Sequence, residues 1–322
     1  MNAPPALPDR IGEVFEGRYR IEALIGKGGF GAVYRATQLG IGRSVALKVL
    51  AAKMAKNPKE VARFEQEARI VAALEHPHIV SLIELGQAAD GSLFLVMEYL
   101  EGESLARRLR RGRMADDEVR LLGRHMLEAL SEAHAQGVIH RDLKPENLFI
   151  TQHARRGTCL KLLDFGIAKV VGAAAPGEPL TATGMFVGSP KVMAPEQLLG
   201  DPVTSRTDLY AFGCVAYLML TGRLPFVCSN IAAYVRAHLS EAVPPITRDG
   251  VALAGPMVDV VMRCLAKDPR ARPASADEVL AAWNKAAPRP IKRRSAHVRW
   301  LVVLSASLLL GIGLGLAVIQ AL

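Results

Sequence analysis

The run His140-Arg-Asp-Leu-Lys-Pro-Glu-Asn147 is followed in this chain by Asp164-Phe-Gly166. Together the two runs supply carboxylate, amide and ammonium side chains over a short length of sequence. Hard oxygen ligands of this kind suit magnesium and the charge on a phosphoryl group that is being transferred. The two runs also occur in order with the motifs described below, and chance production of the whole set is negligible.

A glycine cluster lies near the start of the chain. Gly26, Gly28 and Gly31 have the spacing G-x-G-x-x-G, which dinucleotide-binding folds also use. In a dinucleotide-binding fold the last glycine opens a helix, whereas here Gly31-Ala-Val-Tyr-Arg-Ala36 continues as a strand. The loop is therefore expected to cover phosphates as a flap.

A lysine and a glutamate follow this loop. Lys48, in Val45-Ala-Leu-Lys48, is expected on the next strand but one, where it can hold α- and β-phosphates. The helix after it has start signals in Asn57, Pro58 and Glu60. Its apolar face comprises Val61, Phe64, Ala68, Val71 and Leu74. Glu67 lies on that face and needs a partner, for which Lys48 is the candidate.

Taken together, these motifs resemble those of the eukaryotic-like protein kinases of bacteria, from about Arg18 to Lys285. The resemblance implies an α+β, bilobal kinase fold with a β-rich N-lobe over residues 18–100 and a helical C-lobe over 101–285. It implies transfer of the γ-phosphate of ATP to serine or threonine of protein substrates. ATP and Mg²⁺ are the implied cofactors, with Mn²⁺ as an alternative ion.

The resemblance also assigns roles to residues. Asp142 would accept the substrate hydroxyl proton, and Asn147 and Asp164 would bind magnesium. Lys144 is typical of Ser/Thr-type catalytic loops and would steady the γ-phosphate. The residues implied in ATP binding are Gly26, Lys27, Gly28, Gly29, Phe30, Gly31, Val33, Lys48, Glu67, Glu98 and Tyr99. The backbone of Glu98 and Tyr99 would form the adenine-binding hinge behind Met97, for which core packing is an equally good interpretation.

Further residues have structural or regulatory roles by the same resemblance. Glu196 would pair with Arg272, and Asp208 would brace the catalytic loop. Arg141 precedes Asp142, an arrangement in which phosphate on the activation loop orders that loop. Thr181 and Thr183 are the phosphorylation candidates, the alternative being ordinary loop threonines. Two positions depart from the family pattern: Ser189 replaces threonine and Val192 replaces tyrosine, which leaves the peptide preference open.

The C-terminus carries an uncharged run over residues 301–322. At about 1.5 Å rise per residue it spans the roughly 30 Å core of a bilayer. Upstream lie Arg289, Lys292, Arg293, Arg294, Arg299 and then Trp300, without an acidic residue. This basic flank predicts a cytoplasmic N-terminal side. A buried core helix is the alternative.

The predicted organisation is thus a disordered tail over 1–17, a kinase domain over 18–285, a basic juxtamembrane linker over 286–299 and a transmembrane helix over 300–322. The predicted location is the inner or plasma membrane, crossed once, with the kinase domain in the cytoplasm. Ser307, Gly311 and Gly315 form a stripe of small residues that suggests a homodimer through this helix, although non-associating spans also carry such residues.

Charge and cysteine content exclude other classes. Much of the net charge of +9 comes from the basic flank. In that position the basic residues are expected to contact membrane lipid rather than nucleic acid. The cysteines are widely spaced, which argues against a zinc site or a disulfide framework. Two rival functions remain. A pseudokinase scaffold would lack part of the catalytic set, and a small-molecule phosphotransferase of related fold would lack Ala194-Pro-Glu196.

Overall fold

The structure is a computed structural model that describes residues 10–28, 31–50, 58–153, 157–165, 189–285 and 289–290. The chain divides into two compact units, Met1–Arg289 and Pro290–Leu322. Among the residues of the second unit, the structure describes Pro290 only, so the fold below is that of the first unit.

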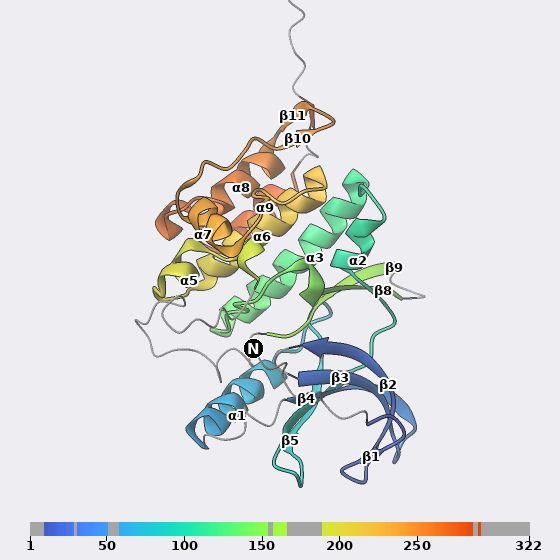
Figure 1. The fold of residues 1–322 in the computed structure, drawn as a ribbon. Helices are drawn as coiled ribbons and strands as arrows, with labels where there is room; N and C mark the ends of the chain where they lie inside the picture. Colours follow the sequence, from blue (N-terminus) through green and yellow to red (C-terminus); the bar gives the residue numbers. More distant parts are fainter. Residues whose placement is uncertain are drawn as a thin grey trace, which may run out of the picture. The chain divides into compact units, whose positions relative to one another are not determined.

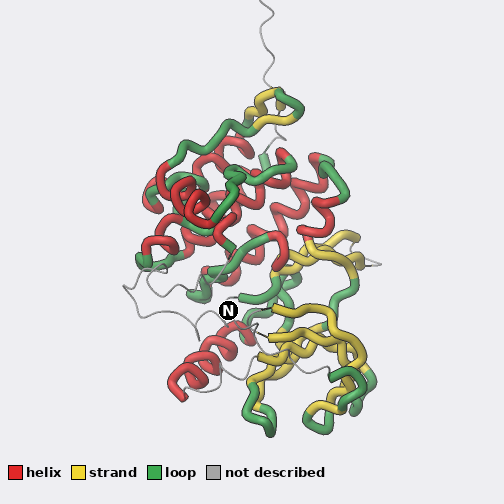
Figure 2. The backbone as a smooth tube through the Cα atoms, viewed as in Figure 1, coloured by secondary structure: helices red, strands yellow, loops and turns green. Residues whose placement is uncertain are grey.

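The N-terminal part is a six-stranded sheet with the order β1-β2-β3-β4-β6-β5. Its strands are antiparallel: β1 (Val14–Phe15), β2 (Tyr19–Gly28), β3 (Gly31–Gln38), β4 (Arg43–Leu50), β5 (Leu82–Gln87) and β6 (Leu93–Glu98). Alternate apolar residues of β2 to β4, including Tyr19, Ile21, Tyr34 and Leu47, are buried together, as the period of a strand requires. Figure 2 shows that strands dominate this part and helices the rest.

One helix, α1 (Pro58–Ala72), belongs to the strand-rich part and lies beside the sheet (Figure 1). Phe64, Ala68 and Val71 are buried on one face, as predicted. Leu74 is buried as well, but it lies beyond the end of the helix. The helix therefore packs against the sheet through the apolar stripe that the sequence indicated.

The C-terminal part is helical, and its longest helix is α3 (Asp116–Ala135). The others are α2 (Leu105–Arg110), α5 (Pro195–Leu199), α6 (Ser205–Thr221), α7 (Ile231–Ser240), α8 (Pro256–Cys264) and α9 (Ala276–Trp283), with 3-10 turns at Pro145–Asn147, Pro190–Val192 and Pro269–Ala271. Nearly every residue of α6 is buried, so this helix forms the centre of the lobe. Trp283 of α9 packs where a Cβ on Gly123 of α3 would lie 2.1 Å from its ring.

Short strands complete the fold. A small sheet contains β7 (Gly102–Ser104), β8 (Leu148–His153) and β9 (Gly157–Leu162), and a hairpin contains β10 (Thr247–Arg248) and β11 (Val251–Ala254); β12 is Arg289–Pro290. Strands β7 to β9, and helices α2 and α5, are absent from the prediction because such short runs carry little periodic signal. The strand predicted from Ile79 begins only at Leu82, while Ile79 forms an isolated bridge with Leu162.

No helix within the described ranges is long and apolar enough to cross a bilayer. The predicted transmembrane helix at 300–322, the linker at 286–299 apart from Arg289–Pro290, and residues 1–9 of the tail lie outside those ranges. The rest of the predicted disordered tail is ordered instead: Val14–Phe15 form β1, which pairs with β2, and Phe15 is buried.

Candidate active site

The loop that follows α3 brings Asp142, Lys144 and Asn147 together. Lys144 Nζ donates to Asp142 Oδ2 at 2.7 Å. Asn147 Nδ2 donates to the Asp142 main-chain oxygen at 2.9 Å and to Asp142 Oδ2 at 3.1 Å. Asn147 lies in a 3-10 turn that leads directly into β8, so the sheet fixes its position. The carboxylate of Asp142 is therefore held in one orientation by two neighbours from its own loop.

This loop is anchored to α6 through Asp208, which is 1% exposed. The carboxylate accepts hydrogen bonds from the main-chain N–H groups of His140 at 2.8 Å and Arg141 at 2.9 Å. Arg141 has a positive φ of 63°, which is strained for a residue with a side chain. Asp208 therefore braces the catalytic loop in a conformation that the loop would not adopt alone, as the sequence implied.

Asp164 lies after β9 and has a φ of 50°. Its Oδ1 accepts from Nζ of Lys48, on β4, at 2.5 Å. The main chain of Leu163 donates to Asn147 O at 2.8 Å, which places Asp164 next to the catalytic loop. Lys48 thus meets Asp164. The side chain of Glu67, its predicted partner on α1, lies outside the part of the chain that the structure describes.

An apolar cavity of about 130 Å³ adjoins these groups. It is lined by Ile25, Val33, Ala46, Val80, Met97, Glu98, Tyr99, Leu100, Phe149, Leu163 and Asp164. A smaller cavity of about 20 Å³ lies beside it and shares Met97 and Asp164 with the first. Flat apolar walls that end at an acidic group suit a planar aromatic ring attached to a charged group. The predicted adenine site at Glu98 and Tyr99 coincides with the larger cavity.

The glycine-rich loop joins the end of β2 to the start of β3. Gly31 has a φ of 147°, and a Cβ there would lie 2.1 Å from Val49 O on β4, so only glycine fits. Gly26 and Lys27 pair with Val33 and Ala32 across the hairpin. The loop tip, Gly29 and Phe30, lies outside the described residues.

A buried ion pair closes the segment after the catalytic loop. Arg272 donates to Glu196 through Nη1–Oε1 at 2.7 Å and Nη2–Oε2 at 2.8 Å, the pair that the sequence implied. Burial alone would raise the pKa of Glu196, but the hydrogen bonds and charge of Arg272 outweigh it and hold the pKa below its ordinary value. The glutamate therefore stays ionised inside the protein.

Residues 19–283 match the protein kinase domain family. The chain belongs to this family. Among curated kinases it is 41% identical over 276 residues to the serine/threonine-protein kinase pkn3 of Myxococcus xanthus, covering 85% of this chain and 50% of pkn3. It is 38% identical over 269 residues to PknJ of Mycobacterium tuberculosis, covering 83% of this chain and 45% of PknJ. The chain thus spans half or less of the length of these relatives.

Solved kinase structures show the same fold. The kinase domain of PknI from Mycobacterium tuberculosis aligns with a TM-score of 0.62 and 27% identity, covering 87% of this chain and 99% of that domain. A double-mutant form of the same domain aligns with a TM-score of 0.66. The bilobal protein kinase fold expected from the sequence is confirmed.

A kinase domain requires ATP and a divalent metal, and the oxygen donors of this domain fit a hard cation. Asn147 uses its amide nitrogen on Asp142, which leaves its side-chain oxygen for a metal. Asp164 gives Oδ1 to Lys48, which leaves Oδ2. One amide oxygen and one carboxylate oxygen therefore remain for magnesium, from the two residues that the sequence indicated.

Four other positions complete the comparison with the sequence. Thr181 and Thr183 lie outside the described residues. Val192, the replacement for tyrosine, is only 6% exposed and belongs to the C-lobe core, where an apolar side chain fits. Ser104, which precedes α2, accepts from Arg107 N at 3.2 Å and caps that helix.

Three residues that were not predicted from the sequence also support the kinase site. Gln197 Nε2 donates to the main-chain oxygen of Arg141 at 3.0 Å. His134 Nε2 lies 2.8 Å from Asp208 Oδ2. Lys161 Nζ donates to Glu98 Oε1 at 2.7 Å and so ties the hinge to β9. No periodic signal in the sequence indicates these pairs. The one available signal is Lys161, a charged residue at an otherwise apolar strand position.

Proposed function

We propose that this chain is a serine/threonine protein kinase that transfers the γ-phosphate of ATP to protein hydroxyl groups. The observation that carries the proposal is the Asp142 carboxylate, held by Lys144 and Asn147. The apolar cavity is lined in part by Asp164, whose Oδ1 accepts from Lys48 Nζ. This arrangement combines a proton acceptor, cationic groups for phosphates and an apolar site for a base.

Each group has a separate task. Asp142 accepts the proton of the substrate hydroxyl, and Lys144, which donates to its carboxylate at 2.7 Å, steadies the γ-phosphate. Lys48 neutralises charge on the α- and β-phosphates, and its contact with Asp164 fixes its position. Magnesium, when bound, screens phosphate charge and aligns the triphosphate. The apolar walls around Met97 and Leu163 hold the adenine and exclude water.

The preference for serine and threonine is supported by Lys144, two positions after Asp142, and by the named relatives, which are serine/threonine kinases. A comparison of the phosphoproteomes of wild type and an Asp142→Asn strain would identify the physiological protein substrates.

The activity is tested by incubating purified protein with labelled ATP, magnesium and a generic basic protein. Asp142→Asn and Lys48→Met are the matched variants, because each keeps the size of the side chain and removes one function. Wild type should label the substrate on serine and threonine, and both variants should lose at least about a hundredfold in rate. Equal labelling by all three proteins would reject the enzyme and leave a nucleotide-binding scaffold as the second candidate.

We propose in addition that the kinase phosphorylates its own activation loop at Thr181 or Thr183. Support comes from Arg141, directly before the base, whose main chain is held by Asp208 and Gln197. An arginine at this position can pair with a phosphate and order the loop. Mass spectrometry after incubation with ATP should find phosphate at one of the two threonines in wild type and none in Asp142→Asn. Phosphate absent from both threonines in active wild type contradicts the proposal.

Membrane anchoring through residues 300–322 is a further proposal, supported by the uncharged run and its basic flank over 286–299. Wild type should sediment with membranes and resist carbonate extraction, while a chain ending at Lys285 should stay in the supernatant. The kinase domain, over residues 18–285, should face the cytoplasm and be digested by protease only in opened cells. Recovery of wild type in the soluble fraction would reject the anchor.

The stripe Ser307, Gly311 and Gly315 supports a homodimer that phosphorylates in trans. Crosslinking in membranes should yield a dimer in wild type and less dimer in Gly311→Leu. Monomer only, unchanged by that substitution, would reject the dimer without affecting the kinase proposal.

A further inference from the structure

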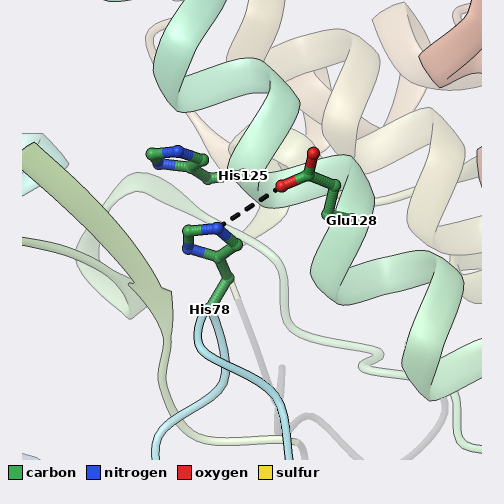
Figure 3. Close-up of side chains that lie close together, drawn as sticks. All are labelled: His78, His125 and Glu128. Carbon is green, nitrogen blue, oxygen red and sulfur yellow. Dashed lines mark ion pairs between the residues drawn. The ribbon is translucent and has the colours of Figure 1, made fainter. Parts of the chain in front are cut away.

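Three potential metal ligands converge away from the catalytic loop (Figure 3). His78 lies in the loop between α1 and β5, while His125 and Glu128 lie three positions apart on α3 and therefore share one face of that helix. One donor atom from each of the three residues lies within 4.8 Å of the others. His78 and His125 are buried, and Glu128 is partly exposed at its side chain.

We propose that His78, His125 and Glu128 form a binding site for a divalent transition-metal ion of the class of Zn²⁺. Two imidazoles and one carboxylate are a common donor set for such ions. The site is distinct from the magnesium ligands and is independent of phosphotransfer.

The geometry of the His78–Glu128 contact fits this proposal. His78 Nε2 and Glu128 Oε2 are 3.4 Å apart. Two ligands of a tetrahedral zinc ion, each bound at about 2.0–2.1 Å, lie roughly 3.4 Å from one another. His78 Nδ1 lies 2.9 Å from the main-chain oxygen of Leu160, and donation to that oxygen leaves the lone pair on Nε2. A carbonyl behind the imidazole is the usual way in which proteins orient a metal-binding histidine.

The position between Glu128 and His125 already contacts a positive charge. Arg124 Nη1 donates to Glu128 Oε1 at 3.2 Å, and Arg124 Nη2 lies 3.4 Å from His125 Nε2. Its side chain is 40% exposed, so it can move into solvent. A metal ion would take the place of this guanidinium, and Arg124 would then compete with the ion.

Both imidazoles are buried beside other ionisable groups. Burial lowers the pKa of His78, and burial together with the charges of His78, Arg124 and His76 lowers the pKa of His125 to about 3. The other groups that face the site are Glu132 on α3, next to His76, and Cys159 on β9, whose Sγ lies 3.3 Å from His78 Nδ1.

One movement is required. The rings of His78 and His125 are stacked, with centroids 3.9 Å apart and planes 17° from parallel. Because an ion lies in the plane of each imidazole that binds it, His125 must turn out of the stack. The contact that it gives up, from Leu160 N to His125 Nδ1, is long at 3.4 Å and therefore weak.

The site would join the loop of His78 to α3, and the His78 loop is itself bonded to β9. The main-chain oxygen of His78 accepts from Leu162 N at 2.9 Å, and Leu162 ends β9 two positions before Asp164. An ion shared by the loop of His78 and by α3 would restrain these two elements relative to one another at this point.

The test uses Co²⁺, whose visible absorption reports nitrogen and oxygen ligands, with the full chain treated with chelator and kept free of nucleotide. Wild type should bind one Co²⁺ that Zn²⁺ displaces, and its thermal unfolding temperature should rise. His125→Gln and Glu128→Gln should each weaken binding at least about tenfold, while Arg124→Gln should tighten it because a competing charge is gone. Asp164→Asn should leave the spectrum unchanged, which separates this site from the magnesium ligands.

Circular dichroism without metal establishes that each variant folds, and the two ligand variants are measured separately. The same Co²⁺ affinity in wild type, His125→Gln and Glu128→Gln would overturn the proposal. So would loss of the spectrum in Asp164→Asn alone, or an affinity of wild type weaker than about 1 mM.

Discussion

Arg272 and Glu196 form a two-pronged ion pair in the C-lobe, although 76 positions separate them in the chain. Arg272 is 2% and Glu196 4% exposed. Arg272 also donates to the main-chain oxygens of Arg206, Lys267 and Ala266, and Thr207 Oγ1 donates to Glu196 Oε1 at 2.8 Å. The hydrogen bonds of Arg272 and Glu196 therefore join α5, α6 and the loop before α9.

Replacing Arg272 with methionine should lower the free energy of unfolding by about 3–5 kcal/mol, because Glu196 would be left charged and buried without its partner. Urea unfolding followed by circular dichroism measures this. The control is Arg270→Met, since Arg270 is 87% exposed and pairs with its neighbour Asp268, and it should leave the midpoint nearly unchanged. Equal effects of the two substitutions would contradict the assigned role of the pair.

Asp208→Asn should reduce phosphotransfer much more than it reduces nucleotide binding. An amide has one oxygen to offer, so it cannot accept from the N–H groups of both His140 and Arg141 as the carboxylate does. The loop with Asp142 would shift, and a misplacement of about 1 Å can cost roughly a hundredfold in rate. Steady-state kinetics measure the phosphotransfer rate, and titration with ATP measures nucleotide binding. A parallel fall in both would show that Asp208 supports the whole fold rather than the loop.

Lys161→Met should raise the KM for ATP about tenfold with a smaller change in kcat. Lys161 is 7% exposed and donates to Glu98 Oε1 at 2.7 Å and to Ile79 O at 3.1 Å, so it positions the hinge that lines the apolar cavity. Lys161→Arg is the matched variant and should recover part of the affinity, because it restores the charge. A change confined to kcat would argue against this positioning role.

Gly123→Ala should destabilise the C-lobe by about 1–3 kcal/mol, since the new Cβ would lie 2.1 Å from the Trp283 ring. Trp283 cannot easily move, because its Nε1 donates to Arg120 O at 2.9 Å and it is fully buried. Gly40→Ala is the control: the space around that Cβ is open, and its stability should change by less than about 0.5 kcal/mol. Thermal unfolding measures both.

Stability should fall as pH falls from about 6.5 to 5. Burial lowers the pKa values of His78, His125, His140 and His238, the second to about 3 and the last to about 4. Below pH 6.5 the unfolded chain therefore binds more protons than the folded chain, and the free energy of unfolding rises with pH. It should level off above about pH 7, where these rings are neutral in both states.

The slope in this window should be about 1.4 kcal/mol per pH unit for each histidine that takes up a proton on unfolding. Urea midpoints between pH 5 and 7.5, with chelator present, measure it. His238→Phe should flatten the slope, because one titrating ring is gone. A stability that does not change between pH 5 and 7 would contradict the burial of these rings.

The sequence alone determined the family, the bilobal fold and the catalytic loop. Short motifs such as His140 to Asn147 carry their chemistry in consecutive residues, so spacing is enough to recognise them. It also gave the face of α1 and the lengths of α3 and α6 closely, since helical periodicity is strong over many residues. The strands β7 to β9 were missed because runs of three to six residues carry little periodic signal.

Only the tertiary structure decided which side chains from distant positions meet. It put Lys48 on Asp164, Lys161 on Glu98 and the ring of His78 on that of His125. Such pairs depend on how the helices and sheets pack. A buried charge also needs a partner to offset the cost of removing it from water, and a local sequence pattern does not show which residue that partner is. Sequence spacing indicated no metal site other than the magnesium ligands, whereas the packing of α3 against the loop of His78 brings three donors together.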